Sequence, residues 1–337
     1  MDSSVIKKYD KEGMIQIYEK WPEMAKNAFN SEYKILDIQG INHIIFAGMG
    51  GSGAIGDIFE AILSKTNIYV SVVKGYLLPK TITENTLIII TSVSGNTVET
   101  LTVLENAKKS KAKVIVFSSG GKCEEFCKKS NTEYYKIQKI HSPRASFIIF
   151  LFSMLKVFQN IISLKIEDVN EAINKLEKLK KKIASHNLTN SNPAIKLAEN
   201  ITNVPLIYYP HGLESAAIRF KNSLQENAKI HVISEDVVEA SHNGIVAWEK
   251  KSIIEPILIE GKDDYKKTKE RWSILKEYFI SQNIKFNEVF ANSDSILSKI
   301  VYLMYFLDFV SIYKAIMLKQ NPTPVKSIDF IKSRLEE

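Results

Sequence analysis

Cysteine is nearly absent from this chain of 337 residues, which contains two. Cys123 and Cys127 lie four residues apart in a predicted helix, and no histidine stands near them at the spacing of a zinc site. Two such cysteines do not form a disulfide framework, so we expect reduced thiols. The expected compartment is therefore the cytoplasm.

Long apolar runs and a hydrophobic leader are also lacking. Residues 1–9 are polar and charged, without the apolar centre of a signal peptide. The most apolar stretch, residues 145–155, stops at Lys156 and is shorter than the roughly 20 residues that a membrane-spanning helix needs. We expect a buried helix there, and no association with a membrane.

The sequence has no concentrated block of one charge. Lysine and arginine number 45 against 38 acidic residues, a formal net charge of +7. The densest basic run, residues 175–180, alternates lysine with leucine and glutamate, as on a solvated helix face. No nucleic-acid motif and no alternation of aromatic and basic residues occurs, so we expect no nucleic-acid partner. A mild positive charge instead suits the attraction of an anionic metabolite.

Apolar runs alternate with amphipathic stretches, which predicts an α/β fold of two doubly wound domains, each a parallel sheet flanked by helices. Strands are expected at residues 44–47, 68–72, 87–91, 114–117, 134–137, 206–209, 230–233, 253–259 and 285–289. Helices are expected at residues 10–29 (broken at Pro22), 54–63, 98–108, 124–128, 145–161, 166–184, 215–225, 265–279, 295–318 and 325–335. The polar run at 185–192 suggests domains of residues 1–185, with a helical arm, and 186–337, with a C-terminal helix.

Two loops rich in glycine and hydroxyl side chains follow predicted strands. Residues 48–53 read Gly-Met-Gly-Gly-Ser-Gly, and residues 92–97 read Ser-Val-Ser-Gly-Asn-Thr. Glycine lets backbone N–H groups approach an anion, and the following helix adds the positive end of its dipole. Neither loop has the lysine of a P-loop, and the first lacks the spacing of a dinucleotide fingerprint. We expect a cradle for one small phosphate ester; two ordinary strand–helix turns are the alternative.

Three side chains outside these loops suit proton transfer on such a substrate. Arg144 precedes a predicted helix, and its permanent charge could stabilise an enediolate. Glu226 ends a predicted helix, where a carboxylate opposes the macrodipole; that place is poor for stability and useful for a general base. His242 lies in a loop and is a natural acid or base near neutral pH. Taken singly, each is more commonly an ordinary structural or surface residue.

Six motifs in order resemble the bifunctional phosphoglucose/phosphomannose isomerase family, part of the phosphoglucose isomerase superfamily of sugar isomerase (SIS) domains. They lie at residues 50–53, 94–100, 143–144, 226–229, 241–243 and 322–325. The resemblance spans residues 48–332 and implies two SIS domains. It also implies a cytoplasmic enzyme of glycolysis and gluconeogenesis that interconverts glucose 6-phosphate, and mannose 6-phosphate, with fructose 6-phosphate. The reaction would pass through a cis-enediol and need neither a metal nor a cofactor.

The resemblance also implies roles for individual residues. Glu226 would be the base that moves a proton between C1 and C2, and Arg144 would stabilise the intermediate. His242, contributed by the neighbouring subunit of a homodimer, and Lys332 would assist ring opening, with Lys326 as the alternative lysine. The substrate phosphate would be held by Gly50, Gly51, Ser52, Ser92, Ser94 and Thr97.

Thr323 matches a position that would leave room for either C2 epimer. The chain departs from the family pattern at three places: Val93 replaces an aromatic residue, Phe220 a tryptophan, and Gly244 a commonly acidic residue. Two other functions stay open, a non-catalytic sugar-phosphate sensor and an amino-sugar phosphate isomerase. The joint presence of the base, the arginine and the histidine speaks against the first. The second commonly carries a glutamine-hydrolysing domain, which this sequence does not show.

Overall fold

A computed structural model describes residues 1–335, which form two compact units. The first-sheet unit comprises Lys20–Asp168 and the C-terminal segment that starts at Val325. The second-sheet unit comprises Met1–Glu19 and Val169–Pro324. The change of unit falls inside helix α8 (Ile166–Ile183). The compact units do not test whether residues 1–185 and 186–337 fold as separate domains, so that division stays a prediction.

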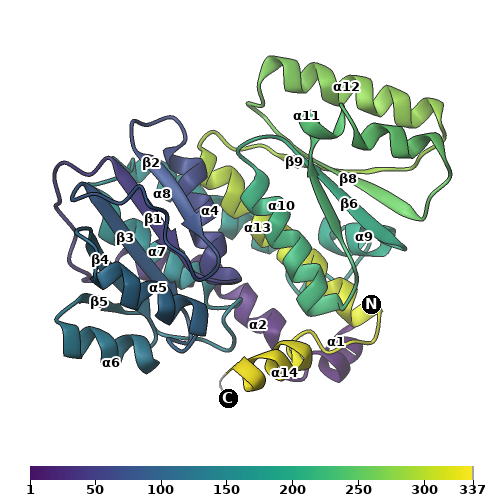
Figure 1. Cartoon of the computed structure of the whole chain (residues 1–337). Helices are drawn as coiled ribbons and strands as arrows, with labels where there is room; N and C mark the ends of the chain where they lie inside the picture. Colours follow the sequence, from purple (N-terminus) through teal and green to yellow (C-terminus); the bar gives the residue numbers. More distant parts are fainter. Residues whose placement is uncertain (336–337) are drawn as a thin grey trace. The chain divides into compact units, whose positions relative to one another are not determined.

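A five-stranded parallel sheet of order β2-β1-β3-β4-β5 centres the first-sheet unit (Figure 1). Its strands are β1 (His43–Ala47), β2 (Tyr69–Val73), β3 (Thr86–Ser92), β4 (Lys113–Ser118) and β5 (Glu133–Lys136). Its helices are α3 (Trp21–Phe29), α4 (Gly51–Leu63), α5 (Val98–Lys108), α6 (Gly121–Ser130), α7 (Phe147–Phe158) and α14 (Lys326–Leu335).

Helices cover both faces of this sheet, which explains why its central strands are apolar throughout. On one face, Ile45 and Ile88 pack with Leu104 of α5 and with the two cysteines of α6. Both thiols are free and buried, and burial raises the pKa of Cys123 to about 12 and that of Cys127 to about 11. On the other face, Phe59 of α4 and Phe158 of α7 contact aromatic rings of the strands.

The second-sheet unit holds a four-stranded parallel sheet of order β7-β6-β8-β9 (Figure 1). Its strands are β6 (Val204–Tyr209), β7 (Ile233–Asp236), β8 (Ile254–Gly261) and β9 (Asn287–Ala291). Its helices are α1 (Ser3–Tyr9), α2 (Met14–Glu19), most of α8, α9 (Pro193–Asn200), α10 (Glu214–Ser223), the π-helix η1 (Leu224–Ala228), α11 (Val237–Ala240), the 3₁₀ helix η2 (Gly244–Glu249), α12 (Lys266–Ser281) and α13 (Ile296–Met317).

The helix α13 forms the centre of this unit. By length and composition alone it could cross a membrane, but 83% of its most apolar window is buried inside the structure. It packs against α9, α10 and η1. Its burial on all sides explains why it is apolar around its whole circumference.

The predicted doubly wound α/β fold is confirmed, and the main differences lie at the N-terminus, in the polar run and at β7, which begins at the last residue of the strand predicted at 230–233. The helical segment predicted at residues 10–29 is interrupted at Lys20, as expected near Pro22, which occupies the first turn of α3, where its missing N–H costs no hydrogen bond. The polar run is ordered around Asn192, which is fully buried. The Asn192 side-chain amide donates to Ile183 O and its oxygen accepts from the N–H of Ala194, so it joins α8 to α9 within one unit.

Candidate functional site

The two glycine- and serine-rich loops lie side by side at one edge of the first sheet. Strands β1 and β3 are parallel neighbours, with Ala47 paired to Ile90, so both strands end at the same edge of the sheet. That carboxyl edge is where open α/β sheets bind ligands. The expectation that residues 48–53 and 92–97 follow adjacent strands is therefore confirmed.

Both loops open onto helices whose N-termini have no side-chain cap. Gly50 is the N-cap of α4 with a φ of 52°, and Thr97 is the N-cap of α5. Neither makes a side-chain hydrogen bond to its helix. Helix N-termini without such caps leave N–H groups for an anion, and their dipoles favour negative charge.

Hydroxyl side chains connect the loops. Ser52 is buried, and its Oγ accepts from the N–H of Val93 at 3.4 Å. Ser92 donates to the Thr97 hydroxyl at 3.3 Å. Ser94, which is half-buried, accepts from the N–H of Asn96 at 3.3 Å. Ser52 thus bonds to the backbone of the second loop, while Ser92, Ser94 and Thr97 form bonds within that loop.

A third loop, which the sequence analysis missed, fixes the second one in place. Ser119 Oγ donates to the Val93 carbonyl at 2.6 Å, and the N–H of Lys122 donates to Asn96 Oδ1 at 2.9 Å. Gly95 has a φ of 72°, and a Cβ there would lie 1.8 Å from Gly120 O. The signal was present in the sequence: Ser118-Ser119-Gly120-Gly121 repeats the strand-to-glycine pattern of the other two loops.

Arg144 is buried and lies on a loop that packs against the first glycine loop. A Cβ on Gly51 would lie 4.0 Å from both the Arg144 Cα and the Pro143 carbonyl oxygen. The loop is held by Ser146, whose Oγ donates to Ile140 O at 2.8 Å, and by Trp21, whose Nε1 donates to Ala145 O at 3.0 Å. The structure therefore brings the backbone of Arg144 close to the first glycine loop.

His141, on the same loop, has an unusual environment. Its φ of 56° lies in the left-handed region, which is uncommon for a residue with a side chain. Its Nδ1 and Nε2 atoms are both buried without a hydrogen-bond partner among the described residues. No local sequence pattern indicated this residue, because the backbone angle and the burial arise from the fold.

Glu226 is half-buried in the π-helix η1, directly after α10. Short π-helical turns are rare and often mark functional sites. Residues on both sides of Glu226 anchor to α13: Ser223 Oγ donates to Asp308 Oδ1 at 2.6 Å, and Asn227 Nδ2 donates to Ser311 Oγ at 2.8 Å. The predicted base therefore lies on a turn that is fixed by buried polar contacts.

A buried ion pair supports the same turn. Arg219 of α10 donates from Nε at 3.0 Å and from Nη2 at 2.6 Å to Asp308 Oδ2, and both side chains are buried. Burial alone lowers the pKa of Arg219, but the Asp308 carboxylate, with a smaller contribution from Glu226, raises it above its usual value. The Arg219 guanidinium, which interacts electrostatically with Glu226, therefore stays positively charged.

Thr323 is connected to the backbone of Glu226 through two residues of the same unit. The Lys229 ammonium donates to the Glu226 carbonyl and, at 3.2 Å, to Asn321 O. Asn321 Oδ1 accepts from the N–H of Thr323 at 3.0 Å. The predicted base and the predicted specificity residue thus belong to one polar chain of contacts, which sequence spacing could not indicate.

His242 is exposed on a turn after α11. Its N–H donates to the Glu239 carbonyl at 2.9 Å, and Asn243 Nδ2 donates to Glu239 Oε1 at 2.8 Å. Beside it, a Cβ on Gly244 would lie 2.7 Å from Glu235 Oε2. The Glu235 carboxylate therefore fills the space that a side chain at position 244 would need.

Lys326 and Lys332 both lie on α14, none of whose described residues is buried. The helix belongs to the first-sheet unit, together with the cradle. Two of its apolar side chains, Phe330 and Ile331, are more than half exposed. The contacts of α14 do not distinguish the two lysines, so the choice of Lys332 stays a prediction.

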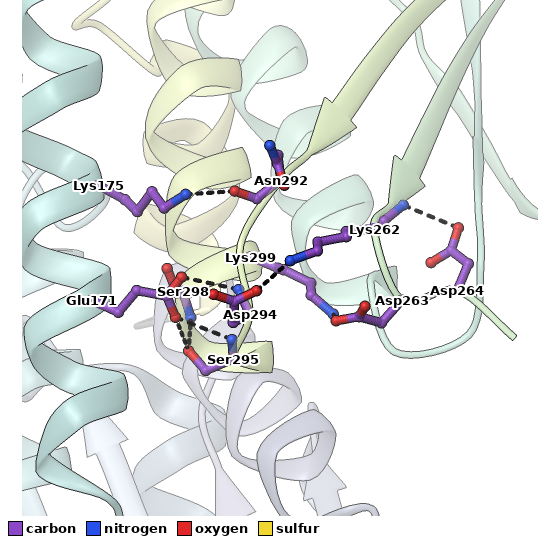
Figure 2. A network of polar contacts seen from close by, with 11 residues as sticks. Glu171, Lys175, Lys262, Asp263, Asp264, Asn292, Asp294, Ser295, Ser298 and Lys299 are labelled. Carbon is purple, nitrogen blue, oxygen red and sulfur yellow. Dashed lines mark hydrogen bonds and ion pairs between the residues drawn. The ribbon is translucent and has the colours of Figure 1, made fainter.

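Paired charges lie at the carboxyl edge of the second sheet, as Figure 2 shows. Lys262 pairs with Asp294 at 2.6 Å, and Lys299 pairs with Asp263 at 3.0 Å. Glu171 of α8 accepts from the N–H of Asp294 at 2.9 Å and from the Ser295 hydroxyl at 2.9 Å. Within residues 1–335, no group of three or more His, Cys, Asp or Glu could hold a metal ion.

Comparisons with known proteins match both units. A family model described as a SIS domain matches residues 37–129, and one described as a bacterial phospho-glucose isomerase C-terminal SIS domain matches residues 190–335. A bifunctional phosphoglucose/phosphomannose isomerase of Caldicellulosiruptor bescii is 30% identical over 94% of this chain and 97% of its own. One of Aquifex aeolicus is 29% identical over 96% of this chain and 99% of its own. A hypothetical protein from Thermus thermophilus shares the fold, with a TM-score of 0.75 at 12% identity, over 99% of this chain and 92% of its own.

Proposed function

The chain belongs to the bifunctional phosphoglucose/phosphomannose isomerase family, and on this premise we propose that it interconverts glucose 6-phosphate and mannose 6-phosphate with fructose 6-phosphate. The observation that carries the proposal is the pair of uncapped helix N-termini at one sheet edge, beside the loop of a buried arginine. Such an arrangement suits a dianionic phosphate next to a reacting centre that develops negative charge. The cytoplasm is the compartment we propose for it.

The phosphate anchors the substrate in this proposal. Helices α4 and α5 both start at the same sheet edge, and Ser52, Ser94 and Thr97 add hydroxyl donors there. Fixed donors of this kind hold a substrate in one orientation, which removes much of the entropic cost of reaching the transition state. The six predicted phosphate residues carry this role.

Proton transfer is assigned to Glu226. A carboxylate can remove the proton from C2 of an aldose and return it to C1 of the resulting enediol, and Arg144 stabilises the negative charge that develops on the enediolate oxygen. The anchoring of η1 on α13 supports this role, because a general base must be held within about 3 Å of the proton that it moves. Thr323 is the residue we propose to admit both C2 epimers.

Ring opening is assigned to His242 and Lys332. The exposure of His242 in a single chain fits a residue that acts in the site of a partner subunit, so we propose a homodimer. A histidine near neutral pH can donate a proton to the ring oxygen and accept one from the anomeric hydroxyl. Lys332 on the exposed α14 is proposed as its helper.

The test is an assay of fructose 6-phosphate formation from each aldose phosphate in EDTA-treated buffer. Conversion of both substrates is expected. Conversion of glucose 6-phosphate alone would preserve the mechanism and remove the role given to Thr323. No conversion of either, with fructose 6-phosphate still bound, would contradict the isomerase proposal and favour a sugar-phosphate sensor.

Glu226→Gln separates catalysis from binding. The variant is isosteric and cannot accept the proton, so turnover should fall at least about a thousandfold while fructose 6-phosphate still binds. Glu249→Gln, at an exposed position of the same unit, is the matched control and should retain full activity. Turnover by Glu226→Gln at the wild-type rate would refute the assigned base.

A further inference from the structure

The loop that carries Arg144 contains an unexplained arrangement at His141. A neutral imidazole has one hydrogen-bond donor and one acceptor. Both ring nitrogens of His141 are buried, and neither has a partner among the described residues. Buried polar atoms are nearly always hydrogen-bonded in folded proteins, so two orphaned atoms on one side chain need an explanation.

The backbone of His141 adds a second unfavourable feature. Its φ of 56° places it in the left-handed region, where a Cβ is poorly tolerated. The flanking residues hold it there: the N–H of Ile140 donates to Ser146 Oγ at 2.8 Å, and Ser142 O accepts from the N–H of Ser146 at 3.0 Å. Strain that the surroundings impose in this way clusters at ligand-binding sites.

The position of His141 points to the ligand concerned. It lies three residues before Arg144, within about 11 Å along the chain at 3.8 Å per residue. The Arg144 Cα in turn lies 4.0 Å from the Cβ position of Gly51, in the predicted phosphate cradle. A sugar that is anchored there by its phosphate presents hydroxyl groups nearby, and a hydroxyl can both donate and accept.

We propose that His141 is a substrate-binding residue whose ring nitrogens hydrogen-bond hydroxyl groups of the sugar that the cradle holds by its phosphate. The inference rests on the proposed function only in taking a phosphorylated hexose as the ligand. Because neither nitrogen is open to solvent in the free protein, the ring turns toward the sugar when it binds, and the bound sugar then satisfies both nitrogens. In the free protein the same side chain is unfavourable for stability, as is common for binding residues.

Two substitutions separate binding from a structural role. His141→Asn places the side chain that best tolerates a positive φ, and His141→Gly removes both the strain and the orphaned atoms. In both variants we expect an unfolding midpoint in urea equal to or above that of the wild type. The Kd for fructose 6-phosphate should rise about five- to tenfold, the range for one or two lost hydrogen bonds. The Kd for inorganic phosphate should change less than twofold. His186→Asn, at an exposed histidine, is the matched control and should alter none of these values.

An unchanged Kd for fructose 6-phosphate would overturn the proposal. So would a lower unfolding midpoint with unchanged binding, because that result makes His141 a structural residue. If both variants fail to fold, ¹⁵N NMR of histidine-labelled wild-type protein decides whether His141 contacts the sugar. The ring signals assigned to His141 should then shift with fructose 6-phosphate and not with inorganic phosphate, and the absence of such a shift refutes the proposal.

The outcome is separable from that of the proposed function. A wild-type protein that binds fructose 6-phosphate through His141 but converts no substrate would contradict the isomerase reaction and leave this inference standing. A wild-type isomerase whose sugar binding does not depend on His141 would refute the inference alone.

Discussion

Replacing Asp308 by asparagine tests how the turn that carries Glu226 is held. Asp308 is fully buried and accepts two hydrogen bonds from Arg219, at 2.6 and 3.0 Å, and one from Ser223 at 2.6 Å. Asparagine has almost the same shape, so the substitution leaves packing intact. It removes the negative charge that pairs with the buried guanidinium.

The magnitude follows from the burial of both partners. Removing one member of a buried ion pair costs about 3–5 kcal/mol, whereas a solvent-exposed pair contributes about 0–1 kcal/mol. We expect Asp308→Asn to lower the free energy of unfolding by about 3–5 kcal/mol. Arg219→Met should cost a similar amount, because it leaves Asp308 uncompensated. The double variant should lose less than the sum of the single losses by about 2–3 kcal/mol, since no unpaired charge remains.

Urea unfolding, followed by circular dichroism, measures these free energies. Glu270→Gln is the control, because Glu270 pairs with Lys267 on the surface of α12 at 2.6 Å, and it should cost less than about 1 kcal/mol. A loss below about 1 kcal/mol for Asp308→Asn, or strict additivity in the double variant, would refute the reasoning. The kcat of Asp308→Asn should also fall, because η1 loses an anchor.

Two further substitutions test the cradle and the start of α13. Gly95→Ala should lower the free energy of unfolding in urea by about 2–4 kcal/mol and raise KM. The φ of 72° at Gly95 disfavours a side chain, and a Cβ would collide with Gly120 O. Gly75→Ala, with no atom near its Cβ position, is the control and should be nearly neutral. For Glu171, burial raises the pKa of the carboxyl, but hydrogen bonds from the N–H groups of Asp294 and Ser295 and from the Ser295 hydroxyl lower it by more. A lowered pKa in the folded state means that this stabilisation is present above the unfolded value of about 4.3 and is lost as the pH falls through the folded value. Wild type should therefore have a higher free energy of unfolding in urea than Glu171→Gln at pH 7, and the difference should vanish in acid. A constant difference down to about pH 2 would contradict the stabilising role given to these hydrogen bonds.

The strands and the two principal loops were predictable because their signals are local. A buried parallel strand needs a continuous apolar run, as at residues 87–91, and a helix that follows a glycine-rich turn has exposed N–H groups wherever it occurs. The neighbouring positions of the loops after β1 and β3 also followed, because parallel strands all end at one edge. The third loop, at residues 118–121, repeats the same pattern and was missed.

The environment of the individual side chains was not predictable. Glu226 was assigned from a motif, but the π-helical turn that carries it depends on contacts between Ser223, Asn227 and a helix some 85 residues later in the chain. The backbone angle and the orphaned nitrogens of His141 likewise depend on Ser146 and on the packing of its loop. No local pattern contains such information.

The sequence by itself therefore determined the α/β class, the order of the strands and, through ordered motifs, the family. These properties depend on hydrophobic periodicity and on the backbone freedom of glycine, which act over a few residues. The tertiary structure alone decided which charges are buried together, as with Arg219 and Asp308, and which polar atoms lack a partner, as at His141. Burial and hydrogen bonding arise only when segments distant in the chain pack against each other, because the cost of a buried charge depends on everything that surrounds it.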